Sequence, residues 1–417
     1  MRWSHTAVVA LTWLSLASAH STELGAQRPA TTAFQVLQPL ADTAKRLFDP
    51  TIGRDVFYVP TMLSFVRWGK LPNAATPAAL TVPSGSLVTF DLVSHEGVLE
   101  DQGRDPVRFF SQFGIPREHI LTDAIRVAAS NIVHEAPRDG PHVISPTVAI
   151  AGAERGDVLK IDMVAMTPRV PYGVNSIRHG KGALPDEFPK TPKPEAGADA
   201  AHSDRFHSVS TLIAIRTAGH GWNAVLATAR RREIVFPVHP FVGTIGVALD
   251  TNVDLSTVPP GVYGGNLDLK QLTVGSTLYL PVQVSGARFF MSDSHFNAGN
   301  GEVDLTSIEG SLRATVRLTL LKAGSPEIPM GRLTTPFAET PEYWIPIGLD
   351  PDLNEAMRAA VRQGVEFLVS RFGMTPTEAY AYLSIRTDFA VTEVVDATKG
   401  VHGLIAKADF ARGTPKK

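Results

Sequence analysis

Short strand-forming runs, each bounded by a glycine or proline turn, recur along most of this chain. The clearest of these runs lie at 86–93, 157–165, 212–215, 233–236, 276–284 and 313–321. In the first run, Val88, Phe90 and Leu92 alternate with their neighbours, which is the period of two that is typical of a strand. Long helical periodicity is scarce before residue 350. We therefore expect a sandwich or barrel of strands rather than alternating βαβ units.

The carboxy-terminal part of the chain changes character and predicts two helices. A helix-start signal at 350–352 precedes apolar residues whose 4-4-3-4 spacing lines one helix face: Met357, Val361, Val365, Leu368 and Phe372. Gly373 ends this helix, and the residues at 375–378 start another. We expect a pair of structural helices packed on a sheet.

The amino terminus has the layout of a secretory signal peptide at 1–19. Residues 6–16 are mostly apolar, and Ala17, Ser18 and Ala19 form a small-residue cleavage site. We expect cleavage after Ala19 and a secreted or periplasmic location. The apolar stretch is too short to span a bilayer with ease, so an uncleaved anchor is the weaker alternative and no stable membrane insertion is expected.

The rest of the chain divides into a leader at 20–75, with little periodicity, and a strand-rich region at 76–410. Within that region, residues 174–207 are polar and rich in proline and glycine, which predicts a long surface loop. This loop either separates two sheet-rich halves or is one insertion on a single fold. A chain of 417 residues has room for two domains or one large one.

Charge and cysteine content exclude several classes of function. Lys and Arg total 39 against 41 for Asp and Glu, a formal net charge of −2 without a long run of either sign. A nucleic-acid-binding protein usually shows a basic excess or stripe, so we expect no nucleic-acid partner. The absence of cysteine removes disulfides, thiolate metal ligands and cysteine nucleophiles. Any metal must therefore be held by His, Asp, Glu, Asn or backbone oxygen.

The densest polar stretch in an apolar context runs from 290 to 302 and continues to Glu309. Asp293 and His295 stand two positions apart, so an extended backbone places both side chains on one face, where they can chelate a divalent metal. The alternative is a turn-capping aspartate beside a histidine of the partial core. Further candidates lie at strand ends or in proline-bounded turns, which favours convergence on one cleft: His95, His142, His239, Asn266 and Asp268.

Several of these segments together resemble the acetamidase/formamidase family. The resemblance rests on the blocks at 259–268, 280–282 and 293–302 and on Glu309, with further similarity at 152–157 and 240–248. It covers residues 75–410 apart from the loop at 174–207. The chain departs from the usual family pattern at five positions: Ser94, Ser292, Ser294, Ala298 and Asn300.

The resemblance implies a mainly β fold, a jelly-roll-like β-sandwich with an added α/β portion and C-terminal helices. It also implies a hydrolase that cleaves the C–N bond of linear amides, such as acetamide or formamide, to carboxylate and ammonia; with the predicted signal peptide, this hydrolase would be exported. A bound divalent metal would activate the water; zinc is favoured, and calcium, manganese or magnesium also suit ligands without thiolate.

The candidate residues take the following roles on this basis. The metal ligands are Asp293 and His295, with His95 or His142 as a third. Glu309 or Glu302 is the general base and acid. The substrate-binding candidates are Asn266, Asp268 and His239.

Two alternatives stay open. One is a non-catalytic exported β-protein on the same scaffold, in which these groups are hydrogen-bonding loop residues. The other is a metal hydrolase for a larger or cyclic amide, which the long 174–207 loop and the altered 292–300 block favour. The expected partner is a small-molecule amide, and the sequence leaves the oligomeric state open, a homo-oligomer included.

Overall fold

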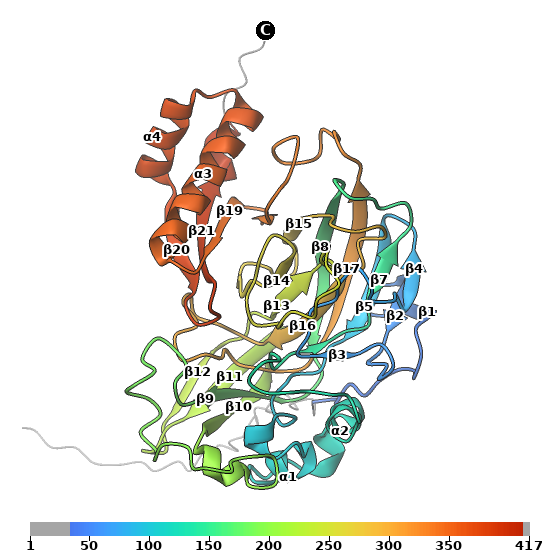
Figure 1. The fold of residues 1–417 in the computed structure, drawn as a ribbon, viewed down its shortest axis with the longest axis vertical. Helices are drawn as coiled ribbons and strands as arrows, with labels where there is room; N and C mark the ends of the chain where they lie inside the picture. Colours follow the sequence, from blue (N-terminus) through green and yellow to red (C-terminus); the bar gives the residue numbers. More distant parts are fainter. Residues whose placement is uncertain (1–33, 412–417) are drawn as a thin grey trace, which may run out of the picture. The chain divides into compact units, whose positions relative to one another are not determined.

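The alternating runs form strands that make up most of the regular structure (Figure 1). The computed structural model describes residues 34–411. The predicted signal peptide at 1–19 and the beginning of the predicted leader therefore lie outside the described residues. Strands account for 34% of the chain and helices for 15%, which confirms the mainly β class.

The largest sheet has ten strands in the order β1-β2-β5-β17-β8-β15-β18-β19-β21-β20. Their bounds are β1 (Lys45–Asp49), β2 (Arg54–Val59), β5 (Ser86–Asp91), β17 (Leu312–Leu321), β8 (Val158–Pro168), β15 (Thr277–Pro281), β18 (Phe337–Glu339), β19 (Tyr343–Asp350), β21 (Lys399–Ala406) and β20 (Asp388–Glu393). Neighbouring strands are antiparallel except β2 and β5, which run parallel. The runs predicted at 86–93, 157–165, 276–284 and 313–321 are β5, β8, β15 and β17.

The predicted leader contributes one edge of this sheet. Strand β1 pairs with β2, and β2 pairs with β5, so residues 45–59 continue the sheet outward. Val56 and Tyr58 of β2 are buried, whereas every residue of β1 is at least partly exposed. An edge strand exposed on both faces needs no apolar alternation, which is why the sequence showed no strand at β1. Residues 34–75 belong to the same compact unit as the rest of the described chain.

Smaller sheets complete the β structure. A four-stranded sheet contains β12 (Glu233–Pro237), β11 (Gly221–Ala227), β10 (Val209–Ala218) and β9 (Tyr172–Ile177), and a three-stranded sheet contains β14 (Gly264–Asn266), β13 (Phe241–Gly246) and β16 (Phe290–His295). Two-stranded sheets pair β3 (Arg67–Trp68) with β6 (Val143–Ile144) and β4 (Leu80–Val82) with β7 (Val148–Ile150). The predicted runs at 212–215 and 233–236 are parts of β10 and β12.

One apolar core joins the large sheet to the three-stranded sheet. Phe90 of β5 and Phe289, just before β16, meet edge to face with ring centroids 5.8 Å apart. Every residue of β13 and β16 is buried, including the polar residues at the end of β16. Burial of polar groups is costly unless they are partnered. The polar residues at the end of β16 must therefore be paired with other polar groups or with a ligand.

Two helices pack on the carboxy-terminal strands as predicted: α3 (Leu353–Phe372) and α4 (Pro376–Arg386). The Asp352 carboxylate accepts hydrogen bonds from the first-turn N–H groups of α3, and Gly373 ends it at a φ of 68°. Thr375 and Glu378 form a capping box at the start of α4.

The predicted face of α3 is buried only in part: Leu368 is buried and Val361 and Val365 pack against the core, but its two end residues are exposed. Met357 and Phe372 are 38% and 36% exposed, whereas Ala356 and Ala360 are fully buried. A Cβ at Gly348 of β19 would collide with the backbone of α3 at Ala356, so helix and strand approach closely. Such an approach selects small residues for the contact, so side-chain volume as well as apolar spacing decides which face is buried.

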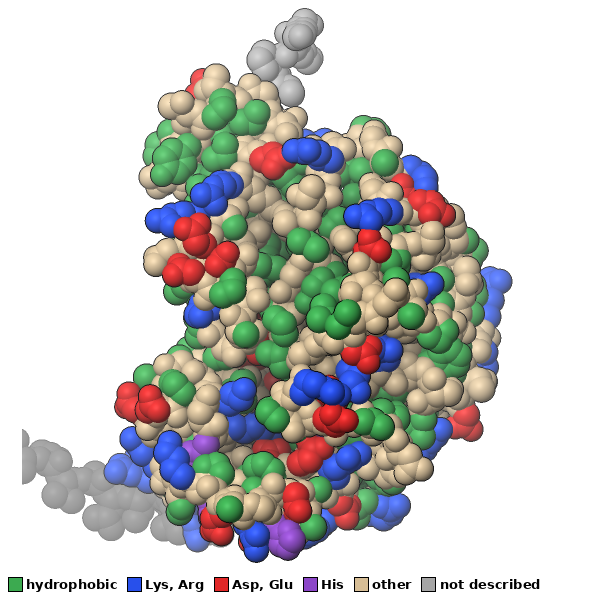
Figure 2. Space-filling view, viewed as in Figure 1, with side chains coloured by type: hydrophobic (Ala, Val, Ile, Leu, Met, Phe, Trp, Pro, Cys, Tyr) green, Lys and Arg blue, Asp and Glu red, His purple; other side chains and the backbone are tan. Residues whose placement is uncertain are grey.

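The remaining helical elements are α1 (Pro106–Ser111), α2 (Thr122–Ala128) and the 3-10 turns Glu100–Gln102, Arg117–His119, Ser203–Phe206 and Lys407–Phe410. The first four residues of the predicted 174–207 loop complete β9, and the loop proper starts at Arg178. Among residues 34–411, no helix has the length and apolar character needed to cross a membrane. On the face shown in Figure 2, basic and acidic side chains are interspersed.

Candidate active site

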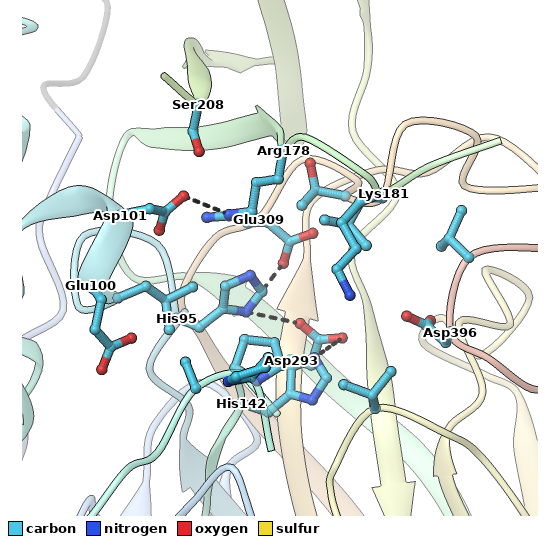
Figure 3. Close-up of a pocket in the computed structure, with 18 of the residues that line it drawn as sticks. His95, Glu100, Asp101, His142, Arg178, Lys181, Ser208, Asp293, Glu309 and Asp396 are labelled. Atoms are coloured by element: carbon cyan, nitrogen blue, oxygen red, sulfur yellow. Dashed lines mark hydrogen bonds and ion pairs between the residues drawn. The ribbon is translucent and has the colours of Figure 1, made fainter. Parts of the chain in front are cut away.

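A cavity of about 320 Å³ collects most of the residues that the sequence singled out (Figure 3). Of the nine candidates, seven line it: His95, His142, Asn266, Asp268, Asp293, Glu302 and Glu309. His295 lies beside them, with Nε2 3.2 Å from a Glu309 carboxylate oxygen. His239 is exposed in the turn between β12 and β13 and is not among the lining residues, so the structure does not bring it to the others.

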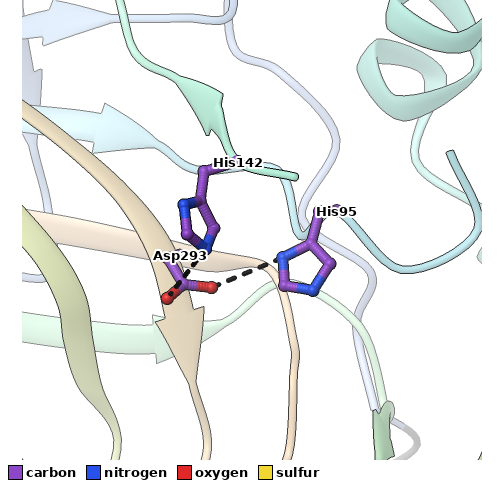
Figure 4. A group of neighbouring side chains, drawn as sticks. All are labelled: His95, His142 and Asp293. Carbon is purple, nitrogen blue, oxygen red and sulfur yellow. Dashed lines mark ion pairs between the residues drawn. The ribbon is translucent and has the colours of Figure 1, made fainter. Parts of the chain in front are cut away.

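Two imidazoles converge on the Asp293 carboxylate (Figure 4). His95 follows β5 and directs Nδ1 to Asp293 Oδ1 at 3.4 Å, and His142 precedes β6 and directs Nε2 to Asp293 Oδ2 at 3.5 Å. All three side chains are buried, and their donor atoms lie within 4.8 Å of one another. Two nitrogens and one oxygen at this spacing are a set that can hold a divalent metal.

Neighbouring side chains fix the orientation of both imidazoles. The far nitrogen of His95, Nε2, lies 3.3 Å from Glu96 Oε1, and the far nitrogen of His142, Nδ1, lies 2.9 Å from Thr257 Oγ1. Glu96 is itself held by Arg178 at 2.9 Å and by the Ser176 hydroxyl at 2.6 Å. Such partners set which nitrogen faces a metal. Glu96 and Thr257 had no role in the sequence analysis, although Glu96 directly follows His95.

His295 connects Asp293 to Glu309. Its Nε2 lies 3.3 Å from Asp293 Oδ1, and its Nδ1 lies 3.6 Å from Asp268 Oδ1. A backbone bridge also joins His295 to Glu309. The Glu309 Oε1 atom accepts a hydrogen bond from the Ser307 N–H, which leaves Oε2 facing the histidines.

A second group of carboxylates adjoins the first. Asp268, Glu302 and Asp396 place one oxygen each within 4.8 Å of the others. The amide of Asn266 accepts from Thr244 and donates to Asp396 at 2.7 Å, so Asn266 positions Asp396. Asp396, in the β20–β21 turn, was missed by the sequence analysis, because an acidic residue in a hairpin turn is an ordinary turn signal.

The site has the features of a cation-binding site. The buried atoms that lack a hydrogen-bond partner in the described structure include His95 Nδ1, Asp293 Oδ1, Glu309 Oε2, both oxygens of Asp268 and both ring nitrogens of His295. Beneath them lies Gly243 of β13, where a Cβ would collide with the Asp268 carboxylate. Buried polar atoms are rarely left unpaired in native proteins. The residues present therefore fit a bound metal ion.

Backbone strain is also concentrated here. Ten non-glycine residues in the described structure have positive φ, and four of them line the cavity: Asp268, Asp293, Glu302 and Leu305. Left-handed backbone at non-glycine residues is unfavourable and clusters at functional sites.

Burial and mutual repulsion raise the pKa of most carboxyl groups in the site, whereas burial is outweighed at Asp293, whose pKa is lowered by the neighbouring His142 and His295. Burial, followed by the charge of Asp293, raises the pKa of Asp268 to about 8. Burial is also the largest cause of the raised pKa of Glu302 and Asp396. Burial lowers the pKa of His142 to about 4, so its imidazole is neutral at pH 7 and offers a lone pair. A bound cation would favour the ionised carboxylates.

His134 in the cavity wall gives a prediction for pH. Its Nδ1 lies 2.9 Å from Glu100 Oε1 and its Nε2 lies 2.9 Å from the carbonyl oxygen of Gly140. Both partners only accept, so the ring is an imidazolium. Burial alone would lower the pKa of His134, but the bonds to Glu100 and Gly140 and the charge of Asp139 raise it above 6.5.

Because the folded state raises this pKa, the stabilisation is fully present below about pH 6.5 and is lost as pH rises through the folded-state value. Denaturant unfolding of the wild type at pH 6 and pH 9 should show a larger fall in unfolding free energy than the H134Q variant shows. An equal fall in both proteins would contradict the assignment.

Buried imidazoles and carboxylates at the floor of a cavity are typical of metal-assisted hydrolases. Residues 126–406 match the model of the acetamidase/formamidase family. The chain belongs to this family of amide hydrolases, and the resemblance seen in the sequence is confirmed.

Individual relatives support the same family. The acetamidase of Mycolicibacterium smegmatis is 27% identical over 312 residues, which cover 61% of this chain and 75% of that protein. A Schizosaccharomyces pombe protein named as a formamidase is 26% identical over 225 residues, 45% of this chain and 54% of that protein, so the chain spans about half the length of this relative. An acetamidase structure from Yersinia enterocolitica has a TM-score of 0.63 at 22% identity and covers 86% of this chain and 95% of that one, which shows a shared fold.

Proposed function

We propose that this protein is an exported amidase that hydrolyses a linear primary amide to a carboxylate and ammonia with water activated by a divalent metal. The observation that carries the proposal is the set of buried, unpartnered atoms around Asp293. The family is one of amide hydrolases, and the relatives are named for acetamide and formamide, whose amide nitrogen is unsubstituted.

The donor set best suited to the metal is His95, His142 and Asp293, because two imidazoles and one carboxylate favour zinc. A second set, Asp268, Asp293 and His295, shares Asp293. A bound divalent ion supplies Lewis acidity toward the amide carbonyl and lowers the pKa of water from about 15.7 toward about 7. Glu96 and Thr257 hold the two imidazoles in the orientation that this role needs.

Glu309 is the better placed of the two candidate bases. Its Oε2 faces the cavity 3.2 Å from His295 Nε2 and 4.0 Å from His95 Nδ1, without an aligned hydrogen bond, so it is placed to take a proton from water. The same oxygen can then hand that proton to the departing nitrogen. Glu302 Oε1 accepts a hydrogen bond from the Ser307 hydroxyl at 2.7 Å. When ionised, this carboxylate would attract the bound cation.

The buried atoms around Asp293 that lack hydrogen-bond partners also disfavour the non-catalytic alternative. A buried polar group without a partner destabilises a protein by about 1–3 kcal/mol. A scaffold that bound nothing would carry several such penalties at one place, whereas a metal-binding enzyme would recover them on loading.

The experiment that tests the proposal is ammonia release from a panel of primary amides by the purified protein, together with metal analysis. Chelation should remove the metal and reduce turnover to the uncatalysed background, and return of zinc should restore turnover. Calcium, manganese and magnesium added separately identify the metal that the site uses.

Ammonia release that survives complete metal removal would contradict the metal-dependent mechanism. Turnover of none of the amides by metal-loaded protein would overturn the amidase proposal itself. Export is checked on protein from its native host, whose mature chain should begin at His20; a chain beginning at Met1 would overturn export.

A further inference from the structure

The cavity is larger than a formyl or acetyl amide requires. Its volume is about 320 Å³, at the lower end of the roughly 300–1,000 Å³ range of pockets that hold drug-sized ligands. A water molecule occupies roughly 30 Å³ of liquid, so an amide of four non-hydrogen atoms would fill only about a third of this space. The remaining volume would hold water, or part of a larger substrate.

Part of the wall above the polar floor is apolar, beside charged lining residues such as Glu100, Arg178 and Lys181. Leu99, Pro137, Val258, Leu305 and Phe206 all line the cavity and come from five different segments of the chain. The charged floor at Asp293 is therefore approached past apolar side chains along part of the wall. Apolar walls with a few polar groups at one end are the usual construction of a pocket that orients an amphipathic ligand.

One wall is supplied by the loop at 178–208. Six of the 26 lining residues belong to it: Arg178, His179, Lys181, Pro194, Phe206 and Ser208. Hydrogen bonds and ion pairs brace this loop. The Arg178 guanidinium lies 2.8 Å from Asp101 and 2.9 Å from Glu96, and the Thr191 hydroxyl donates to the carbonyl oxygen of His207 at 2.6 Å. The wall is thus tied to the same Glu96 that orients His95.

We infer that the substrate is a primary amide whose acyl group is bulky and apolar, such as an aromatic or branched group, with Phe206 packing against it. This inference rests on the proposed amidase function and names its substrate class. The reactive carbonyl must reach the floor at His95, His142 and Asp293, so the acyl group extends along the apolar walls.

The test compares kcat/KM of the metal-loaded protein for formamide, acetamide, isobutyramide and phenylacetamide. Burial of the added apolar groups should raise kcat/KM for phenylacetamide about tenfold to a hundredfold over acetamide. Acetanilide, which carries its ring on the nitrogen, should be the poorer substrate.

Two phenylalanine variants in the same loop distinguish the effect of losing a cavity-lining side chain from a general effect of changing the loop. In F206A, the ratio of kcat/KM for phenylacetamide to that for acetamide should fall about tenfold, because the packing surface is lost. Phe188 is 40% exposed and does not line the cavity, so F188A should leave the ratio unchanged. Equal ratios in F206A and the wild type would overturn the role of Phe206.

The outcomes distinguish this inference from the proposed function. A preference for formamide or acetamide, or for acetanilide over phenylacetamide, overturns the inference while the amidase function stands. Turnover of no amide overturns the function. In that case, calorimetric binding of phenylacetate against acetate still tests the apolar walls, and equal affinity for the two would overturn them as well.

Discussion

Replacement of Asp293 by asparagine should abolish both metal binding and amide hydrolysis. The Asp293 carboxylate lies 3.4, 3.5 and 3.3 Å from ring nitrogens of His95, His142 and His295. It is shared by the donor set with His95 and His142 and by the set with Asp268 and His295. Asparagine keeps the shape but removes the charge that favours a cation. Metal-assisted stabilisation of the transition state amounts to several kcal/mol, so kcat/KM should fall on the order of a thousandfold or more.

The D293N experiment needs two readouts and one matched control. Metal content by elemental analysis should drop from stoichiometric to background, and the thermal stabilisation by added zinc seen in the wild type should disappear. Asp42 is a surface aspartate with its side chain 87% exposed, so D42N should keep both metal and activity. A D293N protein that retains stoichiometric metal would disprove the role of Asp293 as a ligand.

Replacement of Arg169 by methionine should destabilise the fold by about 3–5 kcal/mol, because it leaves the buried Asp123 carboxylate without its charged partner. The Arg169 side chain is fully buried. Its guanidinium lies 2.8 Å from Asp123 and 3.6 Å from Asp91, and it donates to the carbonyl oxygen of Leu37 at 3.0 Å. These contacts fasten the amino-terminal residues of the described chain to the core, away from the cavity.

Denaturant unfolding of R169M and wild type measures this loss directly. R126M is the matched control, because Arg126 pairs with the exposed Asp42 and such surface pairs contribute only about 0–1 kcal/mol. A loss below about 1 kcal/mol in R169M would contradict the assignment of the buried network as a major contributor to stability.

Elements with local signals were predicted well. The strands β5, β8, β15 and β17 follow from alternation between turns, and the ends of α3 and α4 follow from their capping residues at 352, 373 and 375. These signals arise from interactions between residues a few positions apart. The exposed strand β1 and the small buried residues Ala356 and Ala360 of α3 were missed, since the first depends on a neighbouring strand and the second on close contact with β19.

The candidate site shows the same division. The motif analysis found His95, His142, Asp268, Asp293, His295, Glu302 and Glu309, all of which meet in the structure. It also selected His239, which lies elsewhere on the surface, and it missed Asp396 and Glu96. Strand ends and proline-bounded turns indicate that a residue belongs to a loop near a sheet edge, but not which edge.

The sequence by itself determined the chemistry that is available: without cysteine, a metal site must use imidazole and carboxylate, and the family motifs point to amide hydrolysis. Only the tertiary structure decided which donors meet and what surrounds them. His95, His142 and Asp293 come from distant segments. The pairing of β16 with β13 places Asp293 next to Gly243, whose missing side chain leaves room for the carboxylates at the floor of the cavity. The loop at 178–208 became a cavity wall in the same way. Side-chain alternation is fixed by neighbouring residues, whereas convergence depends on long-range pairing and packing of whole strands.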